Sequence, residues 1–422
     1  MRILQISHRN YIAGGSDAVF FATCDLLESL GHEVVRFCMQ DERNEPYELS
    51  RYFPRGADTA RPSSKDAVRY FYNRDAARRL STLLAEQGPF DLAHLHIYHS
   101  KMTPAILPVL KRAGIPIVHT LHEYKLVCPV YTMERNGSVC RECTEGSVVS
   151  AVRNRCKNGS ALHSGVMAAE YMTARAMGDV RLVDRFICVS DFQRREMEQG
   201  GLPPEKLSTL HNFVDTEFFK PGNETGEALL YFGRIEKLKG LPTLIQAVAK
   251  TGQTLKIVGD GSWVAPMQEM IKGMPKVTYL GFRSGDALRE LIRRSSAVVV
   301  PSEWFENCPM SVLEAKACGV PVVGARIGGI PELIEEGADG FLFPPGNTDA
   351  LADVLHSLEQ VDIGKTKLAA RKNALERYSR RAHAKNLLIQ YQQAEGLALT
   401  RCPPRRLRDG WKRVDRIPGS CR

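Results

Sequence analysis

Residues 297–323 read AVVVPSEWFENCPMSVLEAKACGVPVV and decide the fold, because they contain a strand, a loop and a short helix in succession. The apolar, β-branched run at 297–303 ends in turn residues and is typical of a buried strand in a parallel sheet. Pro309 is predicted at the first helical position, where its missing N–H costs nothing. Gly319 suits the position just after the last helical turn. This unit is the repeating element of an open α/β sheet.

Two of the carboxylates in this unit, Glu306 and Glu314, lie eight positions apart. Glu306 is predicted on the loop before the helix, and Glu314 one turn inside it. Both would then lie near the carboxyl end of a strand, where open α/β sheets bind their ligands. The alternative is a surface helix that carries two solvated acids. This stretch alone favours neither reading.

The order of strand, loop and helix recurs along the chain in two series. Strands of the first series are predicted at 2–7, 33–37, 91–96, 115–122 and 185–190. Strands of the second are predicted at 228–234, 254–261, 277–282, 297–303 and 319–325. Two alternating runs imply an α/β protein with two doubly wound, Rossmann-like domains built on parallel sheets.

The predicted boundaries follow from these two series and from shifts in composition. They are an N-terminal domain at 1–212 with a cysteine-rich insert at 126–160, a polar, turn-rich linker at 213–227, a C-terminal domain at 228–372, a final helix at 373–397 and a basic tail at 398–422. We expect the final helix to pack back on the first domain.

The composition is that of a soluble globular protein, with 43% hydrophobic and 25% charged residues in a chain of 422. No apolar run approaches the roughly 20 residues that span a bilayer. The opening MRILQIS lacks the apolar centre of a signal peptide. We therefore expect a cytoplasmic protein, with a place at the inner face of the membrane suggested by its charge.

The formal net charge of +9 is concentrated in the tail, where residues 398–422 hold eight Lys and Arg against two Asp. Such a tail can attract an anionic membrane surface or a phosphorylated partner. A merely solubilising tail is the alternative. Nucleic acid is disfavoured, because no recognition motif accompanies the charge. A second arginine-rich stretch at 51–79 suggests lipid-linked or anionic glycans as partners.

Four of the eleven cysteines are grouped: Cys128, Cys140, Cys143 and Cys156. Their spacings of 11, 2 and 12 intervening residues allow a tetrahedral four-thiolate metal site. Thiolates suit both zinc and iron–sulfur clusters, and a structural zinc is the preferred interpretation. Unliganded thiols in a loop remain the alternative.

Further loops with binding chemistry follow the strands of the second series. GRIEKLKG (233–240) brings Gly233, Arg234 and Lys239 to a turn before a helix, which can form a phosphate-sized site. Gly259 and Gly261 end the next strand and would let the backbone approach a ligand closely. Four loops, at 233–240, 259–261, 302–314 and 326–332, should therefore meet at one edge of the sheet.

The segments GRIEKLKG, VGDG, PSEWFENCPMSVLEAKACGVPVV and GGIPELIEEGADGFLFPPGN resemble the donor-binding half of the family 4 retaining glycosyltransferases. These enzymes have two Rossmann-like domains facing each other across a cleft, the GT-B fold. The similarity is specific across about 228–350 and looser in the first half, where it rests on the Gly14–Gly15 loop, VHTLHEY (118–124), ICVSDFQRR (187–195) and HNFVDTEFF (211–219). It leaves out the insert and the tail.

This resemblance implies roles for the two glutamates. Glu314 would accept hydrogen bonds from the ribose hydroxyls of a nucleotide sugar, since a carboxylate has an oxygen for each donor of a vicinal diol. Glu306 would contact the hydroxyls of the transferred sugar and the charge that develops at its anomeric carbon. The implied function is a retaining transfer from a UDP-, GDP- or ADP-sugar to a glycan or lipid-linked acceptor, in cell-envelope or exopolysaccharide biosynthesis.

The resemblance assigns the remaining site residues as follows. Arg234 and Lys239 would neutralise the diphosphate leaving group, and His122 would lie near the primary hydroxyl of the sugar unless it is simply structural. The donor-binding set comprises Gly14, Gly15, Gly233, Gly259, Gly261, Asn307, Cys308, Pro309, Met310 and Glu314. Many relatives have Gly-Phe-Gly where this chain has Asn307–Cys308–Pro309, which leaves the donor sugar open.

The chain contains no Asp-x-Asp motif, so no catalytic divalent metal is expected. Fixed cations and helix N-termini would stabilise the diphosphate instead. Two alternatives share the fold: a nucleotide-sugar epimerase, and a binding protein without catalysis. A binding protein would lack the first glutamate, whereas an epimerase needs acid and base groups on both faces of the sugar ring.

Overall fold

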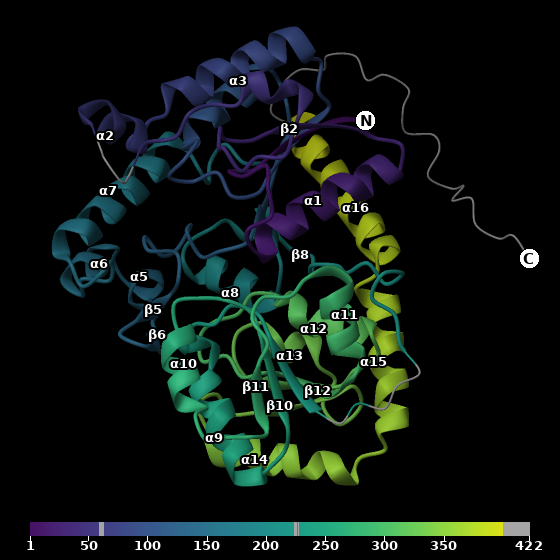
Figure 1. Ribbon diagram of the computed structural model, residues 1–422. Coiled ribbons are helices and arrows are strands. Elements are labelled where there is room, and N and C mark those ends of the chain that lie inside the picture. The colour runs from purple at the N-terminus through teal and green to yellow at the C-terminus, as the bar shows by residue number, and fades with distance from the viewer. Residues whose placement is uncertain (59–62, 223–225, 227, 400–422) are drawn as a thin grey trace, which may run out of the picture.

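The computed structural model shows two α/β domains, one above the other in Figure 1. It describes residues 1–58, 63–222, 226 and 228–399. Part of the predicted linker and nearly all of the predicted basic tail therefore lie outside the described residues. The first two residues of the tail are described and end the last helix. Among the described residues, no helix is long and apolar enough to cross a membrane.

The first domain is built on a six-stranded sheet in the order β2-β1-β3-β4-β7-β8. All five pairings in this sheet are parallel. The strands are β1 (Arg2–Ile6), β2 (Glu33–Phe37), β3 (Leu92–Leu95), β4 (Ile117–Leu121), β7 (Arg185–Cys188) and β8 (Leu207–Thr209). Both β3 and β4 are buried at every position, as expected for strands covered by helices on both faces.

Helices pack around this sheet. They are α1 (Gly15–Ser29), η1 (Glu48–Tyr52), α2 (Ser64–Phe71), α3 (Arg74–Gln87), η2 (Pro104–Ile106), α4 (Leu107–Arg112), α7 (Ala161–Met177), α8 (Asp191–Gln199) and η3 (Pro204–Lys206). The cysteine-rich insert adds β5 (Glu134–Arg135), β6 (Ser138–Val139), α5 (Glu142–Glu145) and α6 (Val149–Arg153).

The second domain has a parallel sheet in the order β11-β10-β9-β12-β13-β14. Its strands are β9 (Ala228–Phe232), β10 (Leu255–Val258), β11 (Val277–Tyr279), β12 (Ser295–Val300), β13 (Val322–Ala325) and β14 (Gly340–Phe343). Its helices are η4 (Lys237–Lys239), α9 (Leu241–Thr251), α10 (Val264–Met270), α11 (Gly285–Arg293), α12 (Met310–Ala317), α13 (Ile330–Leu333), α14 (Thr348–Ser357) and η5 (Leu358–Gln360). The strand order reverses between β9 and β12, and such a switch point is where ligands bind.

Two long helices end the described chain and run along both domains in Figure 1. They are α15 (Ile363–Arg377) and α16 (Arg380–Leu399). Leu387 and Tyr391 of α16 are buried against the first sheet, in one apolar cluster with Ile3 and Val118. The chain thus returns to the first domain after completing the second.

The single helix predicted over 373–397 is interrupted in the structure, so this prediction was wrong. The carbonyl of Tyr378 accepts a hydrogen bond from the N–H of Val214 (2.9 Å), and Val214 also forms a bridge with Ser379. This pairing ends α15 at Arg377, and α16 starts afresh at Arg380. The two crossings between the domains are therefore hydrogen-bonded to each other.

The predicted fold class, two doubly wound parallel sheets, is confirmed by the structure. Helix α12, which follows the loop that carries Glu306, begins one residue later than predicted. Pro309 is its N-cap in an extended conformation rather than its first helical residue. Gly319 follows the helix with φ +70, a left-handed conformation suited to glycine. The prediction missed β8 and β14, which have only three and four residues.

Candidate functional site

The loops after β9 and β12 lie against each other at the switch point of the second sheet. Gly240 ends the loop after β9 with φ +74, and a Cβ at this position would collide with the carbonyl oxygen of Pro301. The N–H of Glu303 also donates to the carbonyl of Leu238 (2.9 Å). The two loops that carry the predicted cations and the first glutamate are therefore held in contact by their backbones.

Glu306 is a buried carboxylate with a paired charge. Its Oε1 accepts hydrogen bonds from Lys239 Nζ (2.5 Å) and from Ser302 Oγ (2.7 Å). Burial by itself would raise the pKa of Glu306, but the positive charge and hydrogen bond of Lys239 outweigh it and hold the pKa below its ordinary value. Glu306 is therefore ionised at neutral pH and fixed in orientation.

Two cations flank the indole ring of Trp304, which sequence reasoning had not singled out. Lys239 Nζ lies 4.6 Å and the Arg234 guanidinium 5.3 Å from the ring centre. The side chain of Arg234 is 58% exposed and pairs only with Glu236 (3.1 Å) among the described residues. Arg234 is thus free to donate to an anion, whereas Lys239 is shared with Glu306.

Glu314 differs from Glu306 in its hydrogen-bond partners and in the direction of its pKa shift. It lies half-buried on α12, and its carboxyl group has no protein partner in the part of the chain that the structure describes. Burial raises the pKa of Glu314 to about 8. Such opposite shifts in two nearby carboxyl groups are typical of functional sites. A pair of hydroxyl donors would satisfy the unpaired group.

Gly233, Gly259 and Gly261 bring two loops together, rather than simply opening space for a ligand. All three have φ between +144 and +159, which strongly favours glycine. A Cβ at Gly259 would collide with the carbonyl oxygen of Gly233, and one at Gly261 with that of Ile235. These glycines therefore fix the loop after β9 against the loop after β10, and so hold Arg234 in place.

A second glycine pair, Gly328 and Gly329, supports Glu306 from the loop after β13. The N–H of Gly329 donates to the carbonyl of Glu306 (2.7 Å). A Cβ at Gly328 would collide with the backbone of Glu306, and one at Gly329 with the carbonyl of Asn307. The two glycines were visible in the sequence, but their partner loop was not.

Gly15, at the start of α1 in the first domain, faces α12 of the second domain. Gly14 is the N-cap of α1, and Gly15 is its first residue. A Cβ at Gly15 would lie 3.9 Å from Cγ of Met310, the first residue of α12. The first turns of α1 and α12 therefore meet between the domains. Helix N-termini carry partial positive charge and unpaired N–H groups, so their meeting suits an anion.

Asn307 and Cys308 connect the site to the first domain. Asn307 Nδ2 donates to the carbonyl of His122 (2.9 Å), while its buried Oδ1 has no partner among the described residues. The carbonyl of Cys308 accepts a hydrogen bond from Asn212 Nδ2 (3.1 Å). The structure thus brings Asn307 to His122, although 185 positions separate them in the chain.

His122 ends a chain of buried hydrogen bonds through the first sheet. Its Nε2 lies 2.8 Å from Nδ1 of His96, and His96 Nε2 lies 3.2 Å from Oε1 of Gln5. Gln5 Nε2 in turn lies 3.3 Å from Nδ1 of His94. The same nitrogen forms a hydrogen bond with the hydroxyl group of Tyr391 (2.8 Å). This hydrogen-bonding chain runs from the site to α16.

The Gln5 amide assigns the protons along this chain. Its oxygen can only accept, so His96 Nε2 carries a proton and His96 Nδ1 accepts from His122 Nε2. The remaining nitrogen of His122, Nδ1, then presents a lone pair. Burial, followed by the charge of His8, lowers the pKa of His122 to about 4. His122 is therefore neutral and acts as a hydrogen-bond acceptor.

Glu332, at the end of the predicted loop 326–332, connects the two domains. Its carboxylate accepts the N–H groups of Asp191 (2.7 Å) and Phe192 (2.5 Å) at the start of α8. His211 Nε2 also lies 3.2 Å away. A carboxylate at a helix N-terminus is electrostatically favourable.

The cysteine-rich insert contacts the second domain through Arg141, which lies between Cys140 and Cys143. Arg141 forms a bidentate ion pair with Glu196 of α8 (2.8 and 3.0 Å). Its guanidinium also lies 4.6 Å from the ring centre of Phe305, the residue before Glu306. The insert is thereby connected to the loop that carries the buried glutamate.

The four grouped thiols are free, with Cys128 buried and the other three half-buried. Burial, followed by the charges of Cys128, Cys156 and Cys140, raises the pKa of Cys143 to about 12. The four sulfurs are therefore close enough to influence one another. Within the described residues, however, no three His, Cys, Asp or Glu side chains have the arrangement of a metal site.

Comparison with protein families assigns both halves of the chain. A family model described as Glycosyltransferase Family 4 matches residues 13–218, and one described as Glycosyl transferases group 1 matches residues 213–377. The chain belongs to the family 4 glycosyltransferases. The predicted family resemblance is confirmed.

Curated relatives of this glycosyltransferase have names that refer to different molecules. The D-inositol 3-phosphate glycosyltransferase of Mycobacterium leprae is 26% identical over 303 residues, which cover 66% of this chain and 63% of that protein. The N-acetyl-alpha-D-glucosaminyl L-malate synthase of Bacillus anthracis is 32% identical over 169 residues, which cover 36% of this chain and 44% of that protein. The match thus spans less than two thirds of each.

Solved structures of similar fold cover almost the whole glycosyltransferase. Anabaena HepE in complex with UDP superposes with a TM-score of 0.65 at 19% identity, covering 93% of this chain and 100% of that one. Sucrose-phosphate synthase from Thermosynechococcus elongatus has a TM-score of 0.69 at 18% identity, covering 93% and 98% of the two chains. These similarities show the GT-B fold.

Proposed function

We propose that this glycosyltransferase moves a sugar from a nucleotide-sugar donor to a glycan or lipid-linked acceptor, with retention at the anomeric carbon. The proposal rests on the presence of two carboxyl groups in different states of ionisation at the switch point of the second sheet. Glu306 is ionised and held by Lys239, while Glu314 is unpaired with a raised pKa. The charge of Glu306 would stabilise positive charge that develops at the anomeric carbon, and the carboxyl group of Glu314 would accept hydrogen bonds from a diol.

The donor would lie between the domains, with its ribose on Glu314 and its diphosphate at the first turns of α1 and α12. Arg234 and Lys239 would neutralise the diphosphate. The bond from the anomeric carbon to the diphosphate oxygen breaks, and its electron pair leaves with the phosphate. The acceptor oxygen bonds to that carbon from the same face, and the acceptor proton passes to the departing phosphate.

Glu306 would stabilise this transition state because its negative charge lies near the carbon as positive charge develops. His122 would accept a hydrogen bond from a sugar hydroxyl at Nδ1. The unpaired Oδ1 of Asn307 offers a second acceptor beside it. Relatives with Gly at this position lack that side chain, so Asn307 is a candidate determinant of the donor sugar.

The proposed activity is tested by release of nucleoside diphosphate from UDP-glucose, with GDP- and ADP-sugars in parallel, with and without a lipid-linked acceptor preparation. UDP comes first because Anabaena HepE has been solved with UDP and with UDP-glucose. Release that depends on the acceptor would support transfer. A changed sugar without nucleotide release would indicate an epimerase, and tight binding without either would indicate a binding protein.

We further propose peripheral contact with an anionic membrane, which supports a role in envelope or exopolysaccharide synthesis. The support is the excess of basic residues at 398–422. Deleting 400–422 should weaken flotation with anionic vesicles on a scale of about 1 kcal/mol per basic residue, while leaving flotation with neutral vesicles unchanged. Equal flotation of the truncated protein with anionic vesicles would refute the role of the tail.

We propose that Cys128, Cys140, Cys143 and Cys156 bind one structural zinc ion. The mutual influence of their sulfurs supports this, and so does the sparse structure around them, with strands of two residues and helices of four and five. Binding would require the short helices to adjust, because the described side chains do not yet surround one point. The ion would stabilise the fold of the insert directly.

Elemental analysis of protein purified without a histidine tag tests this proposal. About one zinc per chain is expected, lost in Cys140→Ser and kept in Cys402→Ser, which changes a cysteine of the tail. Iron in place of zinc would indicate a cluster. Neither metal, together with four freely titratable thiols, would refute it.

A further inference from the structure

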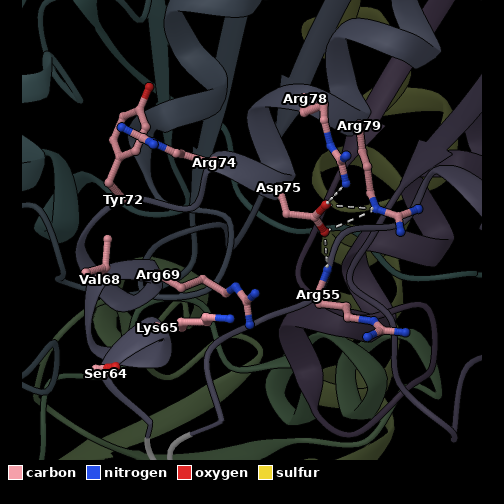
Figure 2. Close-up of a pocket in the computed structure, with 10 residues that line it drawn as sticks. All are labelled: Arg55, Ser64, Lys65, Val68, Arg69, Tyr72, Arg74, Asp75, Arg78 and Arg79. Atoms are coloured by element: carbon pink, nitrogen blue, oxygen red, sulfur yellow. Dashed lines mark hydrogen bonds and ion pairs between the residues drawn. The ribbon is translucent and has the colours of Figure 1, made fainter.

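A strongly basic pocket lies in the first domain, on α2 and α3, and is separate from the donor site. It encloses about 880 Å³ and is open to solvent. The cations of its lining are Arg55, Lys65, Arg69, Arg74, Arg78 and Arg79. In Figure 2, Lys65 and Arg69 of α2 extend toward Arg55, whereas Arg74 of α3 extends toward Tyr72.

The pocket is held in shape by the buried side chain of Asn73. Its Nδ2 donates to the carbonyls of Arg55 (2.9 Å) and Lys101 (2.8 Å). Its Oδ1 accepts the N–H of Ala76 (3.0 Å) and so caps α3. Asn73 thus fixes the segment of Arg55 to the start of α3, and these two parts of the lining are preorganised.

Among the described residues, one carboxylate lines the pocket, and it compensates only part of the charge. Asp75 accepts hydrogen bonds from Arg78 (2.8 Å) and Arg79 (3.1 Å) and from the N–H of Arg55 (3.0 Å). Burial would raise the pKa of Asp75, but these donors lower it below its ordinary value. Its single negative charge is therefore fully engaged.

The remaining cations are arranged unfavourably unless an anion is bound. Lys65 and Arg69 are four residues apart on α2, and Arg74 and Arg78 are four apart on α3. Like charges at this spacing repel each other. Arg69 has a partner in Asp66 (3.1 Å), but Lys65 and Arg74 have no carboxylate partner in the described part of the chain. These two positive charges remain uncompensated.

We propose that this pocket binds a phosphate-bearing group, a phosphate monoester or a diphosphate, of the acceptor. A single carboxylate ligand would leave most of the positive charge uncompensated, whereas a phosphate group carries about two negative charges and matches the fork of a guanidinium. The exposed side chains of Val68 (64%) and Tyr72 (40%) line the same pocket and offer apolar contact to the group that the phosphate carries.

The assignment to the acceptor rests on the proposed glycosyl transfer. The donor diphosphate has its own candidate site between the domains, and the acceptor needs a binding surface on the first domain. Binding of phosphate in the pocket does not depend on catalysis, so it can be tested by itself.

The test is calorimetric titration with inorganic pyrophosphate in the presence of saturating UDP, which blocks the donor site. The double variant Lys65→Gln/Arg74→Gln removes the two uncompensated charges. The matched control, Lys365→Gln/Arg381→Gln, removes one lysine and one arginine from α15 and α16. We expect pyrophosphate affinity to fall at least tenfold in the pocket variant and to stay unchanged in the control, with equal unfolding midpoints.

Vesicle flotation then identifies the source of the phosphate. Loss of pyrophosphate binding in the pocket variant, together with loss of any preference for phosphatidic acid vesicles over phosphatidylserine vesicles of matched charge, would assign the phosphate to a lipid, because the basic tail binds both kinds of vesicle through charge alone. Loss of pyrophosphate binding alone would assign it to a soluble phosphorylated acceptor. Equal pyrophosphate affinity in the wild type and the pocket variant overturns the proposal. Failure of the protein to bind UDP would instead count against the proposed function and leave the pocket result intact.

Discussion

Changing the pH should change donor affinity through Glu314. The free protein holds this half-buried carboxyl group at a pKa of about 8, because it is partly removed from water and has no partner in the described part of the chain. Ribose hydroxyls donate to the ionised form, so binding favours loss of the proton and lowers the pKa in the complex. Affinity for the donor should therefore rise with pH and level off above the pKa of the free protein.

The size of the effect follows from the fraction of Glu314 that is ionised. With a pKa of about 8, this fraction is about a tenth at pH 7 and about three quarters at pH 8.5, so affinity should rise about eightfold. Glu314→Gln keeps the size of the side chain but cannot ionise, and should bind with the same affinity at both pH values. The lost contact should cost about 1–3 kcal/mol at pH 8.5.

The assay is calorimetric titration with UDP-glucose rather than UDP, because the sugar diphosphate has no phosphate proton to exchange in this range. A wild-type affinity that stays flat or falls from pH 7 to 8.5 would refute the reasoning. An equal rise in Glu314→Gln would also refute it, since the dependence would then arise from another group.

Three further predictions follow from the site. Glu306→Gln should lower kcat by about 100-fold or more while changing donor affinity little, because the carboxylate acts on developing charge; equal turnover in the release assay would contradict this. Arg234→Ala and Lys239→Ala should both slow the departure of the diphosphate, and activity should persist in EDTA; a strict magnesium requirement would show that the cations are not sufficient. His96→Phe should lower kcat about tenfold, because it removes the acceptor that orients His122. The ¹⁵N signals of the His122 ring should report a changed tautomer, and unchanged signals would disprove this orientation.

Local patterns in the sequence were enough to predict the fold. The apolar run before Pro301 and the glycine at 319 marked a strand and the end of a helix, and the structure has β12 and α12 there. Such signals depend on periodicity and turn chemistry within a few neighbours. They also placed Glu306 and Glu314 near one strand end.

Sequence reasoning provided candidate residues but did not show every reason why they are needed. Gly259 and Gly261 are predicted to let a ligand approach the backbone, and the structure adds that they allow two loops to touch. Trp304, Ser302 and Arg141 were missed, because an aromatic ring, a hydroxyl and one arginine among many carry no local signal. Their roles depend on partners from distant loops.

The sequence by itself determined the two parallel sheets, the family and the loops that carry the chemistry, since these depend on short-range patterns. Only the tertiary structure decided which charges meet. Lys239 reaches Glu306 across 67 positions, while Glu314 finds no partner among the residues that the structure describes. The two glutamates have the same side chain and similar places on the chain, yet their pKa values move in opposite directions. Burial and pairing set those values, and both exist only after distant segments have packed together.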